Sequence, residues 1–139
     1  EWGLPRAAAR EAVEAVLSLV EKSRLPVSFP IEVRFAAADD AMLSTAHGRD
    51  TAYVAVHQYV GSEWARYFSA VEEVMLDLDG RPHWGKRHEA PAEVLAARYP
   101  DWEAFADVRA RLDPDGLFVN EHLARTLGVA VTERRRSPA

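Results

Sequence analysis

The stretch PVSFPIEVRFAA (residues 26–37) decides the fold class, because apolar residues occupy every second position in it. Successive side chains of a β-strand point to opposite faces, so this alternation predicts a strand with one buried face. That face would carry Val27, Phe29, Ile31, Val33 and Phe35. The other face would carry Glu32 and Arg34, a pair that in most proteins is simply the solvent side of a sheet. Pro30 cannot donate a ladder hydrogen bond, so an edge or a bulge is expected there.

The residues before this strand have apolar side chains at the spacing of a helix. Residues 5–22 predict a packing helix, since Pro5 suits a first helical turn. Its buried face would carry Val13, Val16, Leu17 and Val20. After the strand, the polar connector 38–50 is long for a hairpin, which leaves open an ordered functional loop or a mobile one.

A second strand is predicted over residues 51–60. Its apolar face would carry Val54, Val56 and Val60, and its other face Tyr53, Ala55, His57 and Tyr59. If the two strands are antiparallel neighbours with their apolar faces together, one surface collects an acid, a cation, an imidazole and a phenol. These side chains are Glu32, Arg34, His57 and Tyr59.

The C-terminal half is predicted to be helical between turns. Ser62 is a candidate N-cap for a helix over 64–78, whose aromatic stripe is expected in the core, and Asp79-Gly80 would end it. Further helices are expected over 91–99 and from Asp101 to residue 112. The run 113–116 (DPDG) predicts a turn, and Asn120 would cap a last helix to residue 127, closed by Gly128.

The run Arg81-Pro82-His83-Trp84-Gly85-Lys86 has neither helical nor strand periodicity. A loop that gathers hydrogen-bond donors and an aromatic plane is a better candidate for a ligand site than for packing. A fixed Lys86, with an Arg beside it, could stabilise developing negative charge, and Glu32 or His57 could manage a proton. This set would suit removal of hydrogen from a polyhydroxylated molecule, although residue types alone do not choose that reaction.

Composition narrows the function classes. The chain has 139 residues and a net charge of −5, which favours one domain and argues against a general nucleic-acid-binding surface. It has no cysteine, which excludes disulfides and thiolate chemistry. No histidines have metal-ligand spacing, no serine lies in a nucleophile elbow, and no phosphate-cradling loop is visible. The Arg134-Arg135-Arg136 run is expected to be a solvated terminus.

The sequence contains no apolar run of membrane-span length and no signal-peptide pattern, so cytoplasmic residence is the default expectation. The first residue is Glu1 rather than Met, which hints at trimming or at a boundary within a longer protein.

Three motifs together resemble the C-terminal part of the aldonolactone oxidases: the 81–86 run, Tyr99-Pro100, and the stretch 112–118 (LDPDGLF) with Asn120. That family comprises gulono-, galactono- and arabinono-1,4-lactone oxidases or dehydrogenases, with alditol oxidases as near relatives, in the vanillyl-alcohol oxidase class of flavoproteins. Residues 29–34, Arg49-Asp50 and Val56-His57 also match. The resemblance implies an α+β fold, an antiparallel sheet flanked by helices. Residues 1–128 would form the substrate (cap) region, with 81–128 returning toward the flavin domain and 129–139 as a tail.

The resemblance also implies roles for particular residues. Glu32, Arg34, His57 and Lys86 would be catalytic; Lys86, His83 and Arg34 would face the cofactor; and Glu32, Arg34, His57 and Tyr59 would bind substrate. Hydride would pass from a substrate C–H to flavin N5. FAD would be held mainly by an N-terminal domain that is absent here, so the chain alone is expected to have no turnover. Alditol oxidases have Thr where this chain has Tyr59, which favours a lactone over a straight-chain polyol.

A second reading stays open beside the oxidoreductase. The same polar sheet face would suit a stand-alone module that binds a small polyol without redox chemistry. A surface left open by a missing domain would alternatively bury itself in a homodimer.

Overall fold

The computed structural model describes residues 1–131, so the Arg134–Arg136 run and most of the expected tail lie outside the described residues. The chain divides into two compact units, Glu1–Glu89 and a second that begins at Ala90. The first unit holds a four-stranded antiparallel sheet and two long helices, and the second unit is helical. The fold class is therefore α+β, as expected. Within residues 1–131, no helix has both the length and the apolar character needed to cross a membrane.

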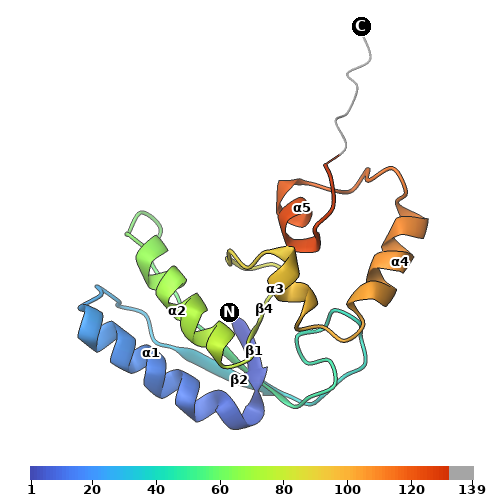
Figure 1. Ribbon diagram of the computed structural model, residues 1–139. Helices are drawn as coiled ribbons and strands as arrows, with labels where there is room; N and C mark the ends of the chain where they lie inside the picture. Colours follow the sequence, from blue (N-terminus) through green and yellow to red (C-terminus); the bar gives the residue numbers. More distant parts are fainter. Residues whose placement is uncertain (132–139) are drawn as a thin grey trace, which may run out of the picture. The chain divides into compact units, whose positions relative to one another are not determined.

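The sheet has the strand order β2-β3-β1-β4, which puts the N-terminal strand in the interior (Figure 1). The strands are β1 (Trp2–Pro5), β2 (Glu32–Ala36), β3 (Thr51–Ala55) and β4 (Arg81–Pro82). β2 and β3 are antiparallel neighbours, with Val33 opposite Val54, as the alternation predicted. β4 pairs with β1, so the run that begins at Arg81 starts as a two-residue strand rather than as a loop.

The expected helix over 5–22 is wrong at its start. Pro5 ends β1, a 3-10 turn follows at Arg6–Ala8, and α1 spans Ala9–Ser23. A four-residue strand is too short to show a period of its own, and Pro5 fits a strand end as well as a helix start. The expected buried face is also only partly correct, because Val16 is buried while Leu17 is exposed.

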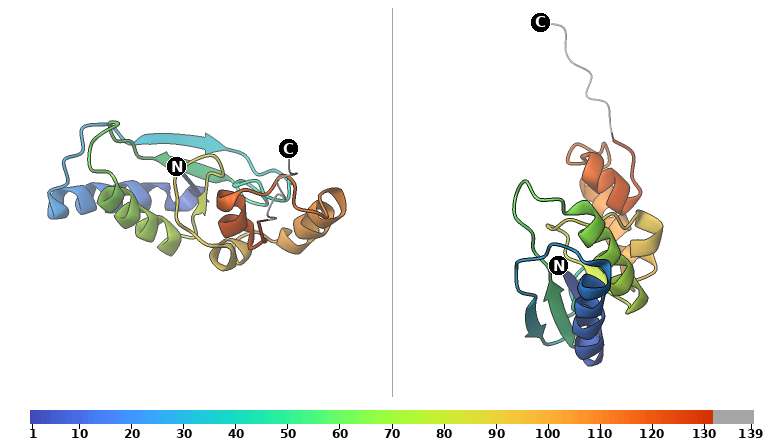
Figure 2. Two further views of the ribbon diagram at one scale, coloured as in Figure 1. Left: turned by 90° about the horizontal axis from the view of Figure 1, so that it is seen from above. Right: turned by 90° about the vertical axis from the view of Figure 1, so that its left-hand side faces the viewer.

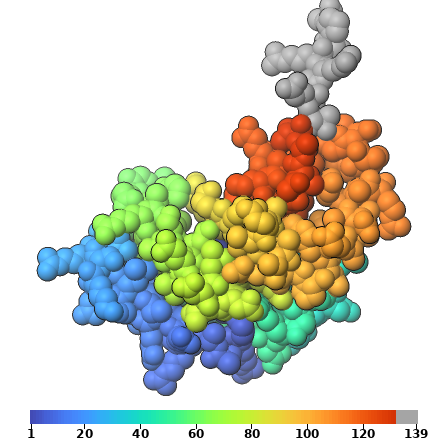
Figure 3. Space-filling model, viewed as in Figure 1, coloured from blue at the N-terminus to red at the C-terminus, as the bar shows by residue number. Residues whose placement is uncertain are grey.

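One face of the sheet packs against helices. The pairing of β1 with β3 puts Leu4 beside Ala52 and Trp2 beside Val54, and all four side chains are buried. α1 and α2 (Ala65–Asp77) lie on the same side of the strands in the view from above (Figure 2, left). They lie next to each other, as the space-filling view shows (Figure 3). The largest buried side chains of this core are Leu4, Val16, Val54, Tyr67, Val71 and Met75. Burial raises the pKa of the Tyr67 phenol.

β2 is the edge strand, and the expectation of a buried apolar face on it is wrong. Val33 is 38% exposed and Phe35 is 60% exposed. β2 is also shorter than predicted, since residues 27–31 lie outside it. Because α1 packs on β3, the next strand inward, the apolar side chains of Val33 and Phe35 on the edge strand stay largely uncovered among the described residues. The guanidinium of Arg6 lies 5.5 Å from the Phe35 ring centroid.

The ends of α2 differ in how well they were predicted. The helix begins at Ala65, and Ser62 is not its N-cap; the Glu63 carboxylate instead accepts a hydrogen bond from the Arg66 N–H. At the other end the expected Asp79-Gly80 stop is confirmed. Asp79 has a positive φ of 57°, and the Gly80 N–H donates to the Met75 carbonyl at 2.7 Å.

The second unit follows the predicted turns and caps closely. Its helices are α3 (Ala92–Ala96), shorter than expected, α4 (Trp102–Leu112) and α5 (Glu121–Leu127). Between α4 and α5 the Asp113 carboxylate accepts hydrogen bonds from the Leu117 and Phe118 N–H groups. The Asn120 side chain caps α5 by accepting from the Leu123 N–H, and Gly128 closes it with a φ of 66°.

Candidate active site

The polar face of the sheet carries a row of alternating charges. In the register of β2 and β3, Glu32 lies opposite Ala55 and Arg34 opposite Tyr53. Arg34 Nη2 lies 2.7 Å from Glu1 Oε1, and Arg34 Nε lies 3.3 Å from Glu32 Oε1. The second oxygen of Glu32 lies 3.5 Å from His57 Nε2. Glu1, Arg34, Glu32 and His57 therefore form one continuous chain of contacts across three neighbouring segments of the sheet.

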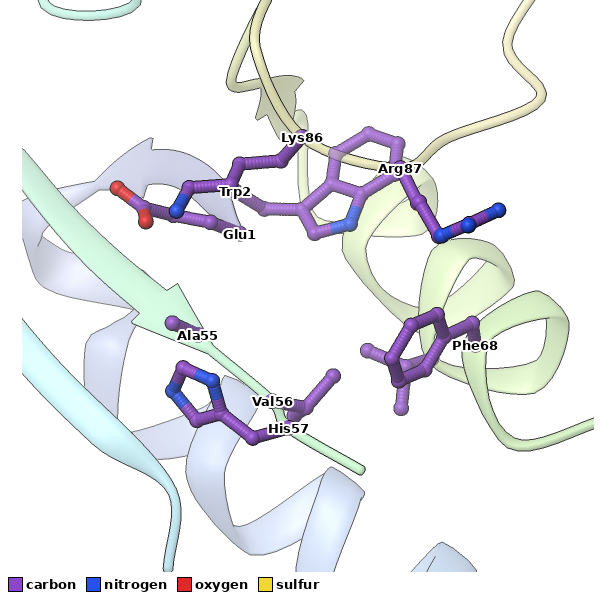
Figure 4. A pocket seen from close by; sticks show the side chains of 9 residues that line it. Glu1, Trp2, Ala55, Val56, His57, Phe68, Lys86 and Arg87 are labelled. Carbon is purple, nitrogen blue, oxygen red and sulfur yellow. The ribbon is translucent and has the colours of Figure 1, made fainter. Parts of the chain in front are cut away.

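A pocket of about 160 Å³ lies at the end of this row, and Glu1, His57 and Lys86 contribute to its wall. The Lys86 side chain reaches toward the Glu1 carboxylate, and the His57 ring lies across the pocket from both (Figure 4). The remaining wall is Trp2, Ala55, Val56, Phe68, Val71 and Arg87. The structure thus brings together Lys86 with His57, and through Glu1 it links both to Arg34 and Glu32.

The turn that presents Lys86 is held at several points. The Lys86 N–H donates to the His83 carbonyl at 2.9 Å, and the Gly85 N–H donates to His83 Nδ1 at 3.1 Å. The His83 N–H in turn donates to the Glu1 carbonyl at 3.0 Å, which ties the turn to the sheet. His83 is absent from the pocket wall, and its ring and backbone shape the turn that presents Lys86. Its expected contact with the cofactor stays a prediction.

Two further residues of the same run fasten the 38–50 loop. The buried Arg81 donates to the His47 carbonyl at 2.8 Å, and the Trp84 indole N–H donates to the Leu43 carbonyl at 2.8 Å. Within the loop, the Asp39 carboxylate accepts from the Ala41 N–H and the Ser44 hydroxyl. The loop that the sequence left open is therefore internally hydrogen-bonded and attached to the Lys86 turn.

Tyr59 belongs neither to the pocket wall nor to the contact row, although it was a predicted substrate-binding residue. β3 ends at Ala55, so the strand that was expected to extend to residue 60 does not carry Tyr59 on the polar face. Its ring instead packs on Phe29, with ring centroids 4.4 Å apart, and Phe29 also lies 6.1 Å from His57. These three aromatic rings form a cluster beside the polar row.

Glu1 is the site residue that sequence reasoning missed. It precedes β1, a strand that was not predicted, and the alternation Glu1, Gly3, Pro5 places it on the polar face. Arg87, the Arg beside Lys86 in the sequence, also lines the pocket, and its guanidinium stacks over the Trp64 ring at 4.5 Å from the centroid. Among the described residues, no group of three or more His, Asp or Glu side chains is arranged to hold a metal ion.

The sequence model of the D-arabinono-1,4-lactone oxidase family matches residues 1–126. The chain belongs to this family. The L-gulono-1,4-lactone dehydrogenase of Mycobacterium tuberculosis is 58% identical over 128 residues, which cover 92% of this chain. The L-gulonolactone oxidase of Mus musculus is 34% identical over 130 residues, covering 90% of the chain. The alditol oxidase of a Streptomyces species is 39% identical over 130 residues, covering 88%.

These matches confirm the family resemblance that the sequence motifs indicated. All three relatives are named as oxidases or dehydrogenases. The chain spans only 30% of the length of each of them. The chain therefore corresponds to one part of the length of these relatives.

Proposed function

We propose that this chain is the substrate-binding, or cap, part of an FAD-dependent oxidoreductase that oxidises an aldono-1,4-lactone or a related polyol. The observation that carries the proposal is the contact row from Glu1 to His57 beside Lys86, in a chain of the D-arabinono-1,4-lactone oxidase family. Both kinds of substrate have several hydroxyl groups, and the lactone also has a carbonyl oxygen. The row and pocket offer them both charged donors and carboxylate acceptors.

FAD fits this chain as a neighbour rather than as a bound group. Pockets for complete small ligands usually measure about 300–1,000 Å³. The pocket here measures about 160 Å³, enough for part of a sugar and too small for a dinucleotide. Its Lys86 ammonium and the nearby Arg34 guanidinium are suitable partners for the oxygen-rich edge of a flavin ring. FAD, held mainly by the rest of a longer protein, would accept the hydride.

The chain's own residues would bind, orient and manage protons. Arg34 and Lys86 would stabilise negative charge on a substrate oxygen or on the reduced cofactor. His57 would take up a hydroxyl proton at its other ring nitrogen, Nδ1, while Nε2, which lies 3.5 Å from the Glu32 carboxylate, would donate to that carboxylate and so stabilise the resulting imidazolium. Glu32 would also orient a hydroxyl group by accepting its hydrogen bond. His83 would keep Lys86 in place.

Substitution of Lys86 tests this proposal in the full-length flavoprotein that carries the chain. Lys86→Ala is expected to lower kcat/KM for gulono-1,4-lactone by about 100-fold, since a fixed charge that stabilises the transition state is removed. Steady-state kinetics on flavin-loaded enzyme measure the effect. Lys22→Ala, at an exposed position near the end of α1, is the matched control and is expected to leave the rate unchanged. Equal kinetics for the two variants would exclude a direct role of Lys86.

The rival function is a stand-alone module that binds a small polyol or forms a homodimer. The exposed Val33 and Phe35 on the edge strand favour some covering partner, which is either the remainder of a longer protein or a second copy. Light scattering on the 139-residue chain separates these possibilities. A monodisperse dimer would support the assembly module, and a monomer would weaken it.

A further inference from the structure

Glu1 is tied into the site at both its side chain and its backbone. Its carboxylate contacts Arg34 at 2.7 Å, and its side chain is only 9% exposed. Its carbonyl accepts the His83 N–H at 3.0 Å, at the base of the turn that presents Lys86. The Glu1 carboxylate is thus fixed beside the cations Arg34 and Lys86, and its negative charge acts on any ligand that enters the pocket.

The charges of the pocket wall are unequal. Among the nine residues that line it, Glu1 is the single acid, whereas Lys86, Arg87 and the titratable His57 are basic. The Arg87 guanidinium stacks on Trp64, and the Lys86 side chain is directed at Glu1 (Figure 4). Without the Glu1 charge, the pocket wall would carry the two cations Lys86 and Arg87 and no acid, which is the composition of an anion-binding site.

Arg34 is restricted by the same carboxylate. Glu1 contacts its Nη2 and Glu32 contacts its Nε, so two carboxylates share one guanidinium. A guanidinium has five N–H donors, so others remain for a ligand. Those donors can serve an uncharged hydroxyl or carbonyl oxygen, while the net charge that would attract a third carboxylate is already balanced.

We propose that Glu1 is a specificity-determining residue, which makes the pocket accept uncharged lactones and polyols and reject carboxylates. The choice of lactone as ligand rests on the proposed function. Opening of a lactone ring by water gives the aldonate, which keeps the other hydroxyl groups and adds one negative charge. The open-chain aldonate therefore differs from the ring in both shape and charge, and a fixed carboxylate adds a repulsion that acts only on the anion.

The substitution Glu1→Gln keeps the size of the side chain and removes its charge. In the flavin-loaded full-length protein, sodium gulonate is measured as a competitive inhibitor against gulono-1,4-lactone. Loss of one unit charge beside the ligand is expected to lower the inhibition constant for gulonate by about tenfold. The change should shrink as salt is added, because salt screens the attraction. Glu1→Asp keeps the charge and should restore rejection of the anion.

Glu14→Gln is the matched control, because the Arg10–Glu14 pair has a similar distance of 2.8 Å but side chains that are 88% and 63% exposed. The Glu14→Gln substitution should leave the inhibition constant for gulonate unchanged. An unchanged gulonate constant in Glu1→Gln, with thermal stability intact, would overturn the proposal while leaving the proposed function standing.

A binding measurement that needs no turnover tests the role of Glu1 separately from the proposed oxidation of lactones. The 139-residue chain, acetylated at its α-amino group so that only side chains contribute charge at Glu1, is titrated with sodium gulonate and followed by the NMR signal of the Arg34 Nε–H group. Tighter gulonate binding by Glu1→Gln than by the unsubstituted chain supports the inference even if the full-length protein does not oxidise lactones. Equal binding by the two chains contradicts it.

Discussion

Gly80 lies at a position that admits no larger residue. Its N–H donates to the Met75 carbonyl at the end of α2, and a Cβ at Gly80 would collide with the oxygen of that same carbonyl. The added atom would also lie 3.2 Å from Leu4 Cδ2 in the core. The close approach places β4, and with it the Lys86 turn, directly after the helix.

Gly80→Ala is accordingly expected to lower the free energy of unfolding by about 2 kcal/mol or more, since neither the carbonyl nor the core can move freely. Urea denaturation of the 139-residue chain measures this. Gly85→Ala serves as the comparison, because its Cβ would meet nothing closer than His83 Cε1 at 3.5 Å. It should change stability by less than about 0.5 kcal/mol. Similar losses for both variants would contradict the steric explanation.

Single residues of the site were predictable to the extent that their local pattern was complete. Glu32 and Arg34 follow from the alternation of residues 26–37, and Lys86 follows from a run that fits no regular period. Glu1 does not follow, because its strand is four residues long and its position depends on pairing with β3 and β4. Tyr59 was misplaced because an alternating pattern does not show where backbone pairing stops.

At the scale of elements, the Lys86 turn and the 38–50 loop act as one unit. Arg81 and Trp84 each donate to a loop carbonyl, and Arg49 from the end of the loop donates to the Gly3 carbonyl at 3.2 Å and forms an ion pair with Asp79. Two donors of the turn thus attach the loop to the turn, and Arg49 attaches the end of the loop to β1 and to the end of α2. Long loops held in this way lose mobility, which favours a fixed position for Lys86.

Trp84→Phe removes one of these donors and keeps most of the aromatic volume. We expect a loss of about 1 kcal/mol in the free energy of unfolding and faster amide exchange across residues 39–47. Trp64→Phe is the control, since the Trp64 side chain is 36% exposed and its substitution should leave exchange in the loop unaltered. Hydrogen exchange read by mass spectrometry provides the test, and unaltered exchange in Trp84→Phe would show that the indole does not hold the loop.

The turn and caps around α5 were predicted best, because their chemistry is local: Asp113, Asn120 and Gly128 each act within a few residues. The predicted Ser62 cap of α2 was wrong. The buried face of β2 was predicted worst. Alternation marks which side chains share a face, but burial depends on whether another element covers that face. In this chain β2 is the edge, and Phe35 stays exposed.

At the scale of the whole molecule, the site residues come from four places along the chain that the first unit gathers. Positions 1, 32–34, 57 and 86 meet at one end of a single sheet. The relatives are more than three times as long as the matched region, since it spans 30% of each. A small pocket and an uncovered edge strand are what a part of such a protein would present.

The isolated chain is therefore expected to be colourless after purification and to show no oxidation of gulono-1,4-lactone, even with added FAD, because its pocket of about 160 Å³ is too small for a dinucleotide. Visible absorption spectra and an electron-acceptor assay measure this. Yellow, flavin-loaded protein with lactone turnover would contradict the proposal that FAD is held mainly by the rest of a longer protein.

The pairing of β1 with β4 joins Gly3 to Arg81, residues that are far apart along the chain. Closing so long a loop costs conformational entropy before any strand contact stabilises it. During synthesis on a ribosome, β1 emerges before the other strands of the sheet. On the side where β4 will pair, it has no partner until Arg81 has left the exit tunnel. The carbonyl of Glu1 can then meet the His83 N–H. The end of the sheet that holds the candidate site would consequently be the last part of the first unit to form, so the residues of α1 are made well before the pocket can close.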